Sequence, residues 1–161
     1  MRPADVAAVL DLLAGVRTWV DGGWGVDALL GETSRDHADL DLVVVDVRLA
    51  RSALVGGGFR HVLRDWLPTA LALADDAGRE VDLHPVIPTS DGGGDQVLPG
   101  GSSFHYPAPV AGVIGGRAVS CVDAATQITC HLGYSPQDKD FADVRRLAGR
   151  FGISLPEPYR G

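Results

Sequence analysis

Hydrophobic and polar positions follow two periods along the chain, and these periods predict its secondary structure. In the N-terminal segment apolar residues recur at a helical spacing, and Gly15 follows as a stop signal. Elsewhere, short runs with strict alternation or continuous apolar character predict strands. The expected helices span 4–14, 23–31, 47–55 and 123–132, and the expected strands span 17–20, 39–46, 59–64, 69–74 and 79–86.

Turn signals connect these elements. A turn at 75–78 joins two strands as a hairpin, and a second hairpin is expected over 112–120. Residues 88–101 are rich in Gly, Pro and Asp, which predicts a loop that acts as a mobile lid. The pattern predicts a mixed, twisted sheet with flanking helices, an α/β (α+β) fold, in a single domain over 1–161.

The last helix has its own start signal and core face. Ser135 begins a capping box with proline at the first helical position. The core face is expected at Phe141, Val144, Leu147 and Phe151, so this helix pairs with the one before it. The proline-rich residues after Ser154 predict a loose tail.

Composition excludes several classes of protein. No apolar run approaches the ~20 residues of a membrane helix, and the amphipathic N-terminal segment does not resemble a signal peptide, so no membrane contact and a cytoplasmic location are expected. Cys121 and Cys130 are too few for a disulfide framework and predict buried free thiols. The net charge of −7 argues against nucleic acid as a partner and is compatible with a cationic small substrate.

Candidate chemistry begins with Asp39 and Asp41. Residues two apart in a strand share one face, so the two carboxylates point the same way at the start of the apolar run LVVV. Crowded like charges repel unless a cation lies between them, which predicts a metal site. The alternative is a pair of solvated carboxylates at a strand end.

A glycine turn precedes this strand. Gly22, Gly23 and Trp24 lie where a strand gives way to a helix. Glycine allows a ligand close to the backbone, and a helix N-terminus offers free N–H groups to a phosphate. A phosphate cradle next to a carboxylate pair suits a magnesium–nucleotide complex.

These motifs carry a resemblance to a known family. The segments GGWGVD and RDHADLD resemble the nucleotidyltransferase fold shared with DNA polymerase β, and more narrowly the small antibiotic nucleotidyltransferases. Similarity to the lincosamide nucleotidyltransferases is the stronger, and that to the aminoglycoside 2″-adenylyltransferases is more distant. It continues at VDLHPV (81–86), FHYP (104–107) and HLGY (131–134).

The resemblance implies that Asp82 completes a metal-binding and catalytic triad with Asp39 and Asp41. As an acid in an otherwise apolar strand, Asp82 needs a partner, and a metal or an acceptor hydroxyl would supply one. The alternative is an ion pair with an arginine such as Arg79. Glu80 and His84 share the face of Asp82.

Further candidates surround this triad. Arg35 is expected to pair with phosphate oxygens and His37 to orient a carboxylate, with loop solubility as the alternative for both. Asp27 either binds substrate or favours the helix dipole. His84, His105 and Tyr106 are expected to contact the acceptor, together with Trp66, with packing as the alternative; His131 and Lys139 are expected to be a packing residue and a surface residue.

The predicted activity is transfer of a nucleoside monophosphate from a nucleoside triphosphate, expected to be ATP, to a hydroxyl of a small molecule. The resemblance implies two Mg²⁺ ions and an antibiotic acceptor, a lincosamide or an aminoglycoside. A protein side chain or a tRNA end as acceptor stays open, as does a homodimer. A non-catalytic nucleotide-binding scaffold is the alternative from another class, and retention of all three carboxylates disfavours it.

Overall fold

The computed structural model describes residues 1–160, which form five helices and nine strands. The helices are α1 (Pro3–Leu12), α2 (Gly22–Leu30), α3 (Val47–Gly56), α4 (Ala124–Cys130) and α5 (Asp138–Phe151). The strands are β1 (Thr18–Val20), β2 (Asp39–Val44), β3 (His61–Trp66), β4 (Ala70–Ala74), β5 (Glu80–Pro88), β6 (Gly94–Val97), β7 (Ser103–Tyr106), β8 (Val110–Ile114) and β9 (Arg117–Cys121).

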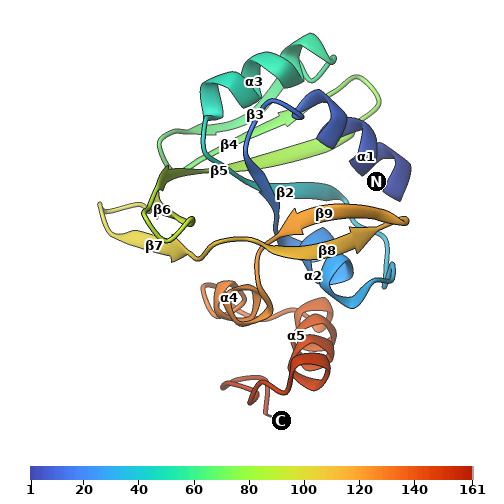
Figure 1. The fold of residues 1–161 in the computed structure, drawn as a ribbon, viewed down its shortest axis with the longest axis vertical. Coiled ribbons are helices and arrows are strands. Elements are labelled where there is room, and N and C mark those ends of the chain that lie inside the picture. Colours follow the sequence, from blue (N-terminus) through green and yellow to red (C-terminus); the bar gives the residue numbers. More distant parts are fainter. Residues whose placement is uncertain (161) are drawn as a thin grey trace.

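The strands form the mixed sheet that the sequence predicts. Its order is β3-β4-β5-β2-β1-β9-β8, and the β6–β7 hairpin extends from β5. The pairs β2–β5 and β1–β9 are parallel, and the other neighbours are antiparallel. The helices α1 and α3 lie against one face of this sheet (Figure 1).

Alternation along the strands separates that covered face from the opposite one. The largest core cluster takes every second residue of the central strands, such as Leu40, Leu42 and Leu83, and packs them against α1 and α3. The intervening residues, among them Asp41 and Asp82, point away from that core. The polar site therefore lies on the side of the sheet opposite α1 and α3.

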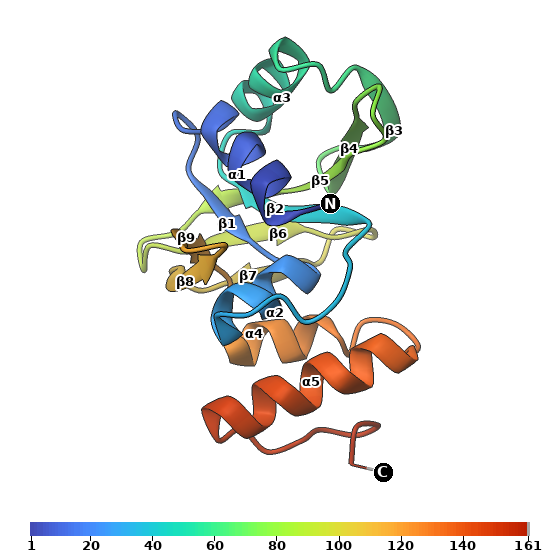
Figure 2. The same ribbon diagram turned by 90° about the vertical axis from the view of Figure 1, so that its right-hand side faces the viewer.

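A second layer contains α2, α4 and α5 below the sheet (Figure 2). Val144 and Leu147 of α5 are buried there, as predicted. Two predictions for this region are wrong. Phe151 is 44% exposed because it stands in the last turn, beyond the packed part of the helix. The tail is anchored because Tyr159 is fully buried and its hydroxyl donates to the carbonyl of His131 at 2.9 Å.

Two further boundaries differ from the predictions. Residues 88–101 contain β6, which pairs with both β5 and β7. Gly94 lacks the side chain that would collide with Val86, so this glycine-rich segment can lie close to β5. The helix α5 begins at Asp138, not after Ser135, because Asp140 accepts the backbone N–H of Gln137 and makes Gln137 the N-cap.

Two predictions from composition concern membrane-spanning helices and the cysteines. None of the helices within 1–160 is long and apolar enough to cross a bilayer. Both cysteines are free thiols, with Cys121 buried and Cys130 partly buried, as expected.

Candidate active site

The centre of the site is formed by two neighbouring parallel strands. The register of β2 and β5 pairs Asp39 with Glu80 and Asp41 with Asp82. One ligand atom each from Asp41, Asp82 and His84 lies within 4.8 Å of the other two. A long-range strand pairing thus brings together side chains that are about 40 positions apart in the sequence.

Asp39 lies beside this group but outside its closest set of atoms. Burial raises the pKa of Asp39, and the negative charges of Asp41 and Asp82 raise it further. The ammonium group of Lys139 opposes this rise, which places the single lysine of the chain within electrostatic reach of the site. The carboxylates are therefore crowded, as the sequence predicts, and a cation between them would relieve the repulsion.

Asp82 is held from one side by an arginine that the sequence did not indicate. Its Oδ2 accepts a hydrogen bond from Arg64, so the alternative of an ion pair with an arginine is met on this oxygen, whereas Arg79, the arginine named for it, donates from Nε to Asp75 at 2.6 Å. Asp82 is only 8% exposed, and its Oδ1 has no hydrogen-bond partner within residues 1–160. A buried carboxylate oxygen without a partner beside a second carboxylate suits a hard divalent cation such as Mg²⁺.

His84 supplies positive charge at the centre of the carboxylates. Its Nε2 lies 3.4 Å from Oδ1 of Asp41, and its Nδ1 lies 3.3 Å from Nε2 of Gln96. Burial alone would lower the pKa of His84. The hydrogen bond to Asp41 and the charges of Asp41, Asp21 and Asp82 outweigh burial and raise this pKa to about 9. The imidazolium form therefore partly balances the carboxylates in the absence of a metal.

The N-terminus of α2 lies directly against the carboxylates. Asp21 is the N-cap, accepts the N–H of Gly22 at 2.8 Å, and donates its own N–H to the carbonyl of Asp41 at 2.9 Å. Gly22 has φ of +58°, and a Cβ there would lie 2.0 Å from Oδ2 of Asp41. A Cβ on Gly23 would lie 2.3 Å from Nδ1 of His37. Both glycines are needed because site side chains fill the space beside the backbone.

Buried hydrogen bonds hold the polar loop between α2 and β2. Nε2 of His37 lies 2.6 Å from Oδ2 of Asp27, and the N–H of Ser34 donates to the other oxygen of Asp27 at 3.1 Å. Burial alone would raise the pKa of Asp27. The hydrogen bonds from His37 and Ser34 outweigh burial and lower this pKa. Asp27 is 2% exposed, and its carboxylate holds His37 and Ser34; the sequence had left substrate binding and a favourable interaction with the helix dipole as its two alternatives.

Arg35 lies over the N-terminus of α2. Its Nη2 donates to Asp143 of α5 at 2.9 Å and would be 2.7 Å from a Cβ on Gly23. This position is compatible with the expected phosphate contact, since the guanidinium is adjacent to the first-turn amides of the helix.

His105 and Tyr106 were expected to contact the acceptor, with packing as the alternative, and strand alternation places them on opposite faces of β7. Tyr106 is buried, and its hydroxyl donates to Oε1 of Gln96 at 3.4 Å. His105 is exposed, with Nδ1 2.7 Å from Asp95 and Nε2 2.9 Å from Asp91. It therefore connects the β6–β7 hairpin to the preceding loop and does not join the carboxylate group.

Sequence reasoning missed three residues that contact the predicted site. Asp21 had a usable signal, because an acidic residue directly before a glycine-rich helix start is a common N-cap. Arg64 had a weaker one, since it lies two residues before Trp66, an expected acceptor contact, and so shares its face in a strand. Gln96 had none, because it lies in the stretch that was predicted to be a loop.

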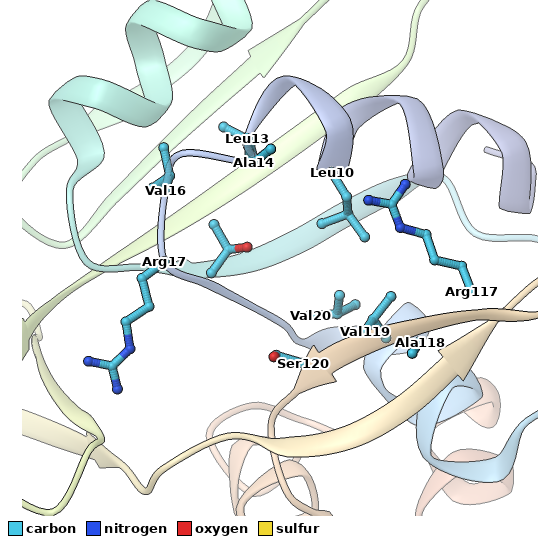
Figure 3. Close-up of a pocket in the computed structure, with 11 residues that line it drawn as sticks. Leu10, Leu13, Ala14, Val16, Arg17, Val20, Arg117, Ala118, Val119 and Ser120 are labelled. Carbon is cyan, nitrogen blue, oxygen red and sulfur yellow. The ribbon is translucent and has the colours of Figure 1, made fainter.

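A separate cavity of about 300 Å³ lies between α1 and the strands β1 and β9 (Figure 3). Apolar residues such as Leu10, Val16 and Val20 form much of its lining, with Arg17 and Arg117 at opposite ends. Both arginines have partners, because Arg117 pairs with Asp11 at 2.7 Å and Arg17 donates to the carbonyl of Gly92. None of the predicted site residues lines this cavity.

Comparison with known proteins shows the family of this chain. The family model of the aminoglycoside-2″-adenylyltransferases matches residues 5–147. A lincosamide resistance protein of Staphylococcus haemolyticus is 27% identical over 146 residues, which cover 86% of this chain and 89% of that protein.

Solved structures show the same fold. A lincosamide antibiotic adenylyltransferase bound to lincomycin matches with a TM-score of 0.79 and 26% identity, over 94% of this chain and 97% of that chain. ANT(2″)-Ia in complex with adenylyl-2″-tobramycin matches with a TM-score of 0.71 and 20% identity, over 93% and 89% of the two chains. The nucleotidyltransferase fold predicted from the sequence is confirmed.

Proposed function

We propose that this chain, which belongs to the aminoglycoside-2″-adenylyltransferase family, transfers the adenylyl group of ATP to a hydroxyl of a lincosamide or aminoglycoside antibiotic. The observation that carries the proposal is the pairing of Asp41 with Asp82 beside the N-terminus of α2. Carboxylates and helix amides at one point suit a metal-bound triphosphate.

The carboxylates would hold Mg²⁺. Asp41 and Asp82 belong to the group whose ligand atoms lie within 4.8 Å of one another, and Asp39 adds a third carboxylate from the same strand face as Asp41. The unpartnered Oδ1 of Asp82 supports this assignment, because such an oxygen is costly to bury without a cation or a donor. When bound, Mg²⁺ supplies the positive charge that a triphosphate and its developing negative charge need. Two ions, as the sequence predicts, would fit a set of three carboxylates.

The residues around α2 would position the nucleotide. The backbone N–H groups of Gly23 and Trp24 belong to the first helical turn, where intrahelical partners are missing. The guanidinium of Arg35 lies next to them and can pair with phosphate oxygens. His37, fixed by Asp27, supports this turn through contact with the ring of Trp24 at 4.6 Å between centroids.

Asp82 would also accept the proton of the acceptor hydroxyl, through the lone pair of Oδ1 that the metal leaves unused. The hydroxyl oxygen attacks the α-phosphorus, the bond from that phosphorus to the bridging oxygen breaks, and pyrophosphate leaves. Arg64 occupies the other oxygen of Asp82 and so fixes the direction of the carboxylate.

Mass spectrometry tests this function directly. The protein is incubated with Mg²⁺, with ATP or GTP, and with lincomycin or tobramycin, and a mass gain of one nucleoside monophosphate is expected on an antibiotic. Calorimetry with ATP should show much tighter binding with Mg²⁺ than without it. No mass gain on either antibiotic would reject the proposed acceptors, and equal ATP affinity with and without Mg²⁺ would reject the metal assignment.

A further inference from the structure

From Asp82 toward the edge of the sheet, the same face carries small side chains on β4 and large side chains on β3. The register pairs Asp82 with Ala72 of β4 and Ala72 with Arg64 of β3, and it pairs Ala70 with Trp66. Leu71 and Leu73, which alternate with these alanines along β4, point into the core on the other face. The face beside Asp82 therefore has a floor of alanines with Arg64 and Trp66 along its outer side.

The alanine floor allows the side chains of β3 to lie across β4. Arg64 reaches over Ala72 to hydrogen-bond Oδ2 of Asp82, and it also lies 3.5 Å from Oε1 of Glu80. A longer side chain at position 72 would block this path. The charged head of Arg64 is thus fixed next to the proposed general base, on the side away from α2.

Trp66 presents an aromatic surface at the same place. It is 64% exposed, and the guanidinium carbon of Arg64 lies 5.8 Å from the centre of its ring. An exposed indole offers a flat apolar surface on which the ring of a bound molecule can stack. The other two tryptophans, Trp19 and Trp24, are each 1% exposed and belong to the core.

We propose that the acceptor lies on this β3–β4 face, with a neutral sugar ring on Trp66 and its reactive hydroxyl at Asp82, and that Arg64 selects against acceptors with many ammonium groups. The proposal rests on the proposed function. It deepens that function by assigning the acceptor site and by favouring lincosamides, which carry one basic amine, over aminoglycosides, which carry several. A fixed guanidinium repels an additional cation placed beside it.

Arg64 is therefore a specificity-determining residue, and its effect is separable from its hold on Asp82. Loss of the Asp82 contact affects every acceptor alike, whereas a change of charge affects a polycation more than a monocation. The ratio of the Kd of a polycationic acceptor to the Kd of a monocationic acceptor removes the effect that both acceptors share. Arg51 provides a matched control, because it is also an arginine paired with an aspartate, Asp65 at 3.5 Å, on the opposite face of β3.

Two measurements on the full chain test the proposal, both with Mg²⁺ and a non-reactive ATP analogue. The first is acrylamide quenching of tryptophan fluorescence, which reports Trp66 because the other two indoles are buried. Lincomycin should protect the fluorescence, and the protection should vanish in Trp66→Leu. In that variant the lincomycin Kd should rise roughly tenfold, as expected for loss of a ring stack.

The second is calorimetry with lincomycin and tobramycin. In Arg64→Glu the ratio of tobramycin Kd to lincomycin Kd should fall by at least ~10-fold relative to the wild type, and in Arg51→Glu it should stay unchanged. Unprotected Trp66 together with a mass gain on lincomycin would overturn the acceptor site and leave the proposed function intact. An unchanged ratio in Arg64→Glu would overturn the role of Arg64. Absence of both binding and mass gain would overturn both proposals.

Discussion

The two faces of β2 and β5 differ completely, although their residues alternate along the same backbone. On one face Leu40, Leu42 and Leu83 are fully buried under α1 and α3. On the other face Asp41 and Asp82 lie side by side with a buried oxygen that has no partner in the described chain. The apolar face gains free energy from burial, whereas the polar face stores repulsion that a ligand can relieve. Substitutions on the apolar face should therefore change stability, and substitutions on the polar face should change activity.

The largest effect is expected at Asp41. Asp41→Asn should abolish turnover, because it removes a metal ligand at the centre of the group. Asp39→Asn should do the same. Asp39→Asn should unfold in metal-free buffer at an unchanged or higher temperature, since it removes one of several crowded like charges, whereas Asp41→Asn also loses the hydrogen bond to the His84 imidazolium and should unfold at a slightly lower temperature. Enzyme assays and thermal melts on the same preparations check both points, and a large fall in melting temperature would mean that these carboxylates stabilise the fold.

Substitutions of two neighbouring residues on β5, one on each face, should distinguish the roles of the two faces most clearly. Asp82→Asn should lower the rate by at least ~10²-fold, the low end for a general base, with a modest loss of Mg–ATP affinity and little loss of stability. Leu83→Ala should lower the free energy of unfolding by about 2–5 kcal/mol and leave the rate per folded molecule nearly unchanged. Denaturant melts and steady-state rates test the pair. Normal turnover in Asp82→Asn would move the search for the base to Glu80 or His84.

A substitution at Gly22, the first residue of α2, should have a smaller effect, and it tests the close contact between the helix backbone and Asp41. Gly22→Ala should lower stability by about 1–2 kcal/mol through strain at positive φ and should also weaken Mg–ATP binding, because the new Cβ would collide with Asp41. Gly31→Ala is the control, since Gly31 has φ of +73° and open space around its Cβ position. It should show the strain without the binding defect. Equal nucleotide affinity in the two variants would argue against the role of Gly22.

The smallest effect is expected at His105, which lies outside the group of Asp41, Asp82 and His84. Hydrogen bonds that His105 donates to Asp95 and Asp91 raise the pKa of His105 above its ordinary 6.5. A raised folded-state pKa stabilises the fold below pH 6.5, and this contribution disappears as the pH rises through the folded-state value. His105→Gln should therefore lower the melting temperature slightly at pH 6 and not at high pH, with turnover intact. Melts across this range check it, and a loss of activity would place His105 in the site after all.

Local patterns in the sequence determined what depends on neighbours along the chain. The spacing of Asp39 and Asp41 placed both on one strand face, and the glycines marked the start of α2, since side-chain direction and turn geometry are set within a few residues. The sheet, its mixed character and most helix positions followed from the same periods.

The tertiary structure alone decided which distant groups meet. The register of β2 and β5 brings His84 to Asp41, and the register across β4 makes Arg64 the arginine that pairs with Asp82. Residues 94–97 became a strand because two neighbours offered backbone partners, and Tyr159 was buried because α4 offered it a carbonyl at His131. Such contacts depend on strand order and on packing between segments far apart in the chain, and no local period encodes them.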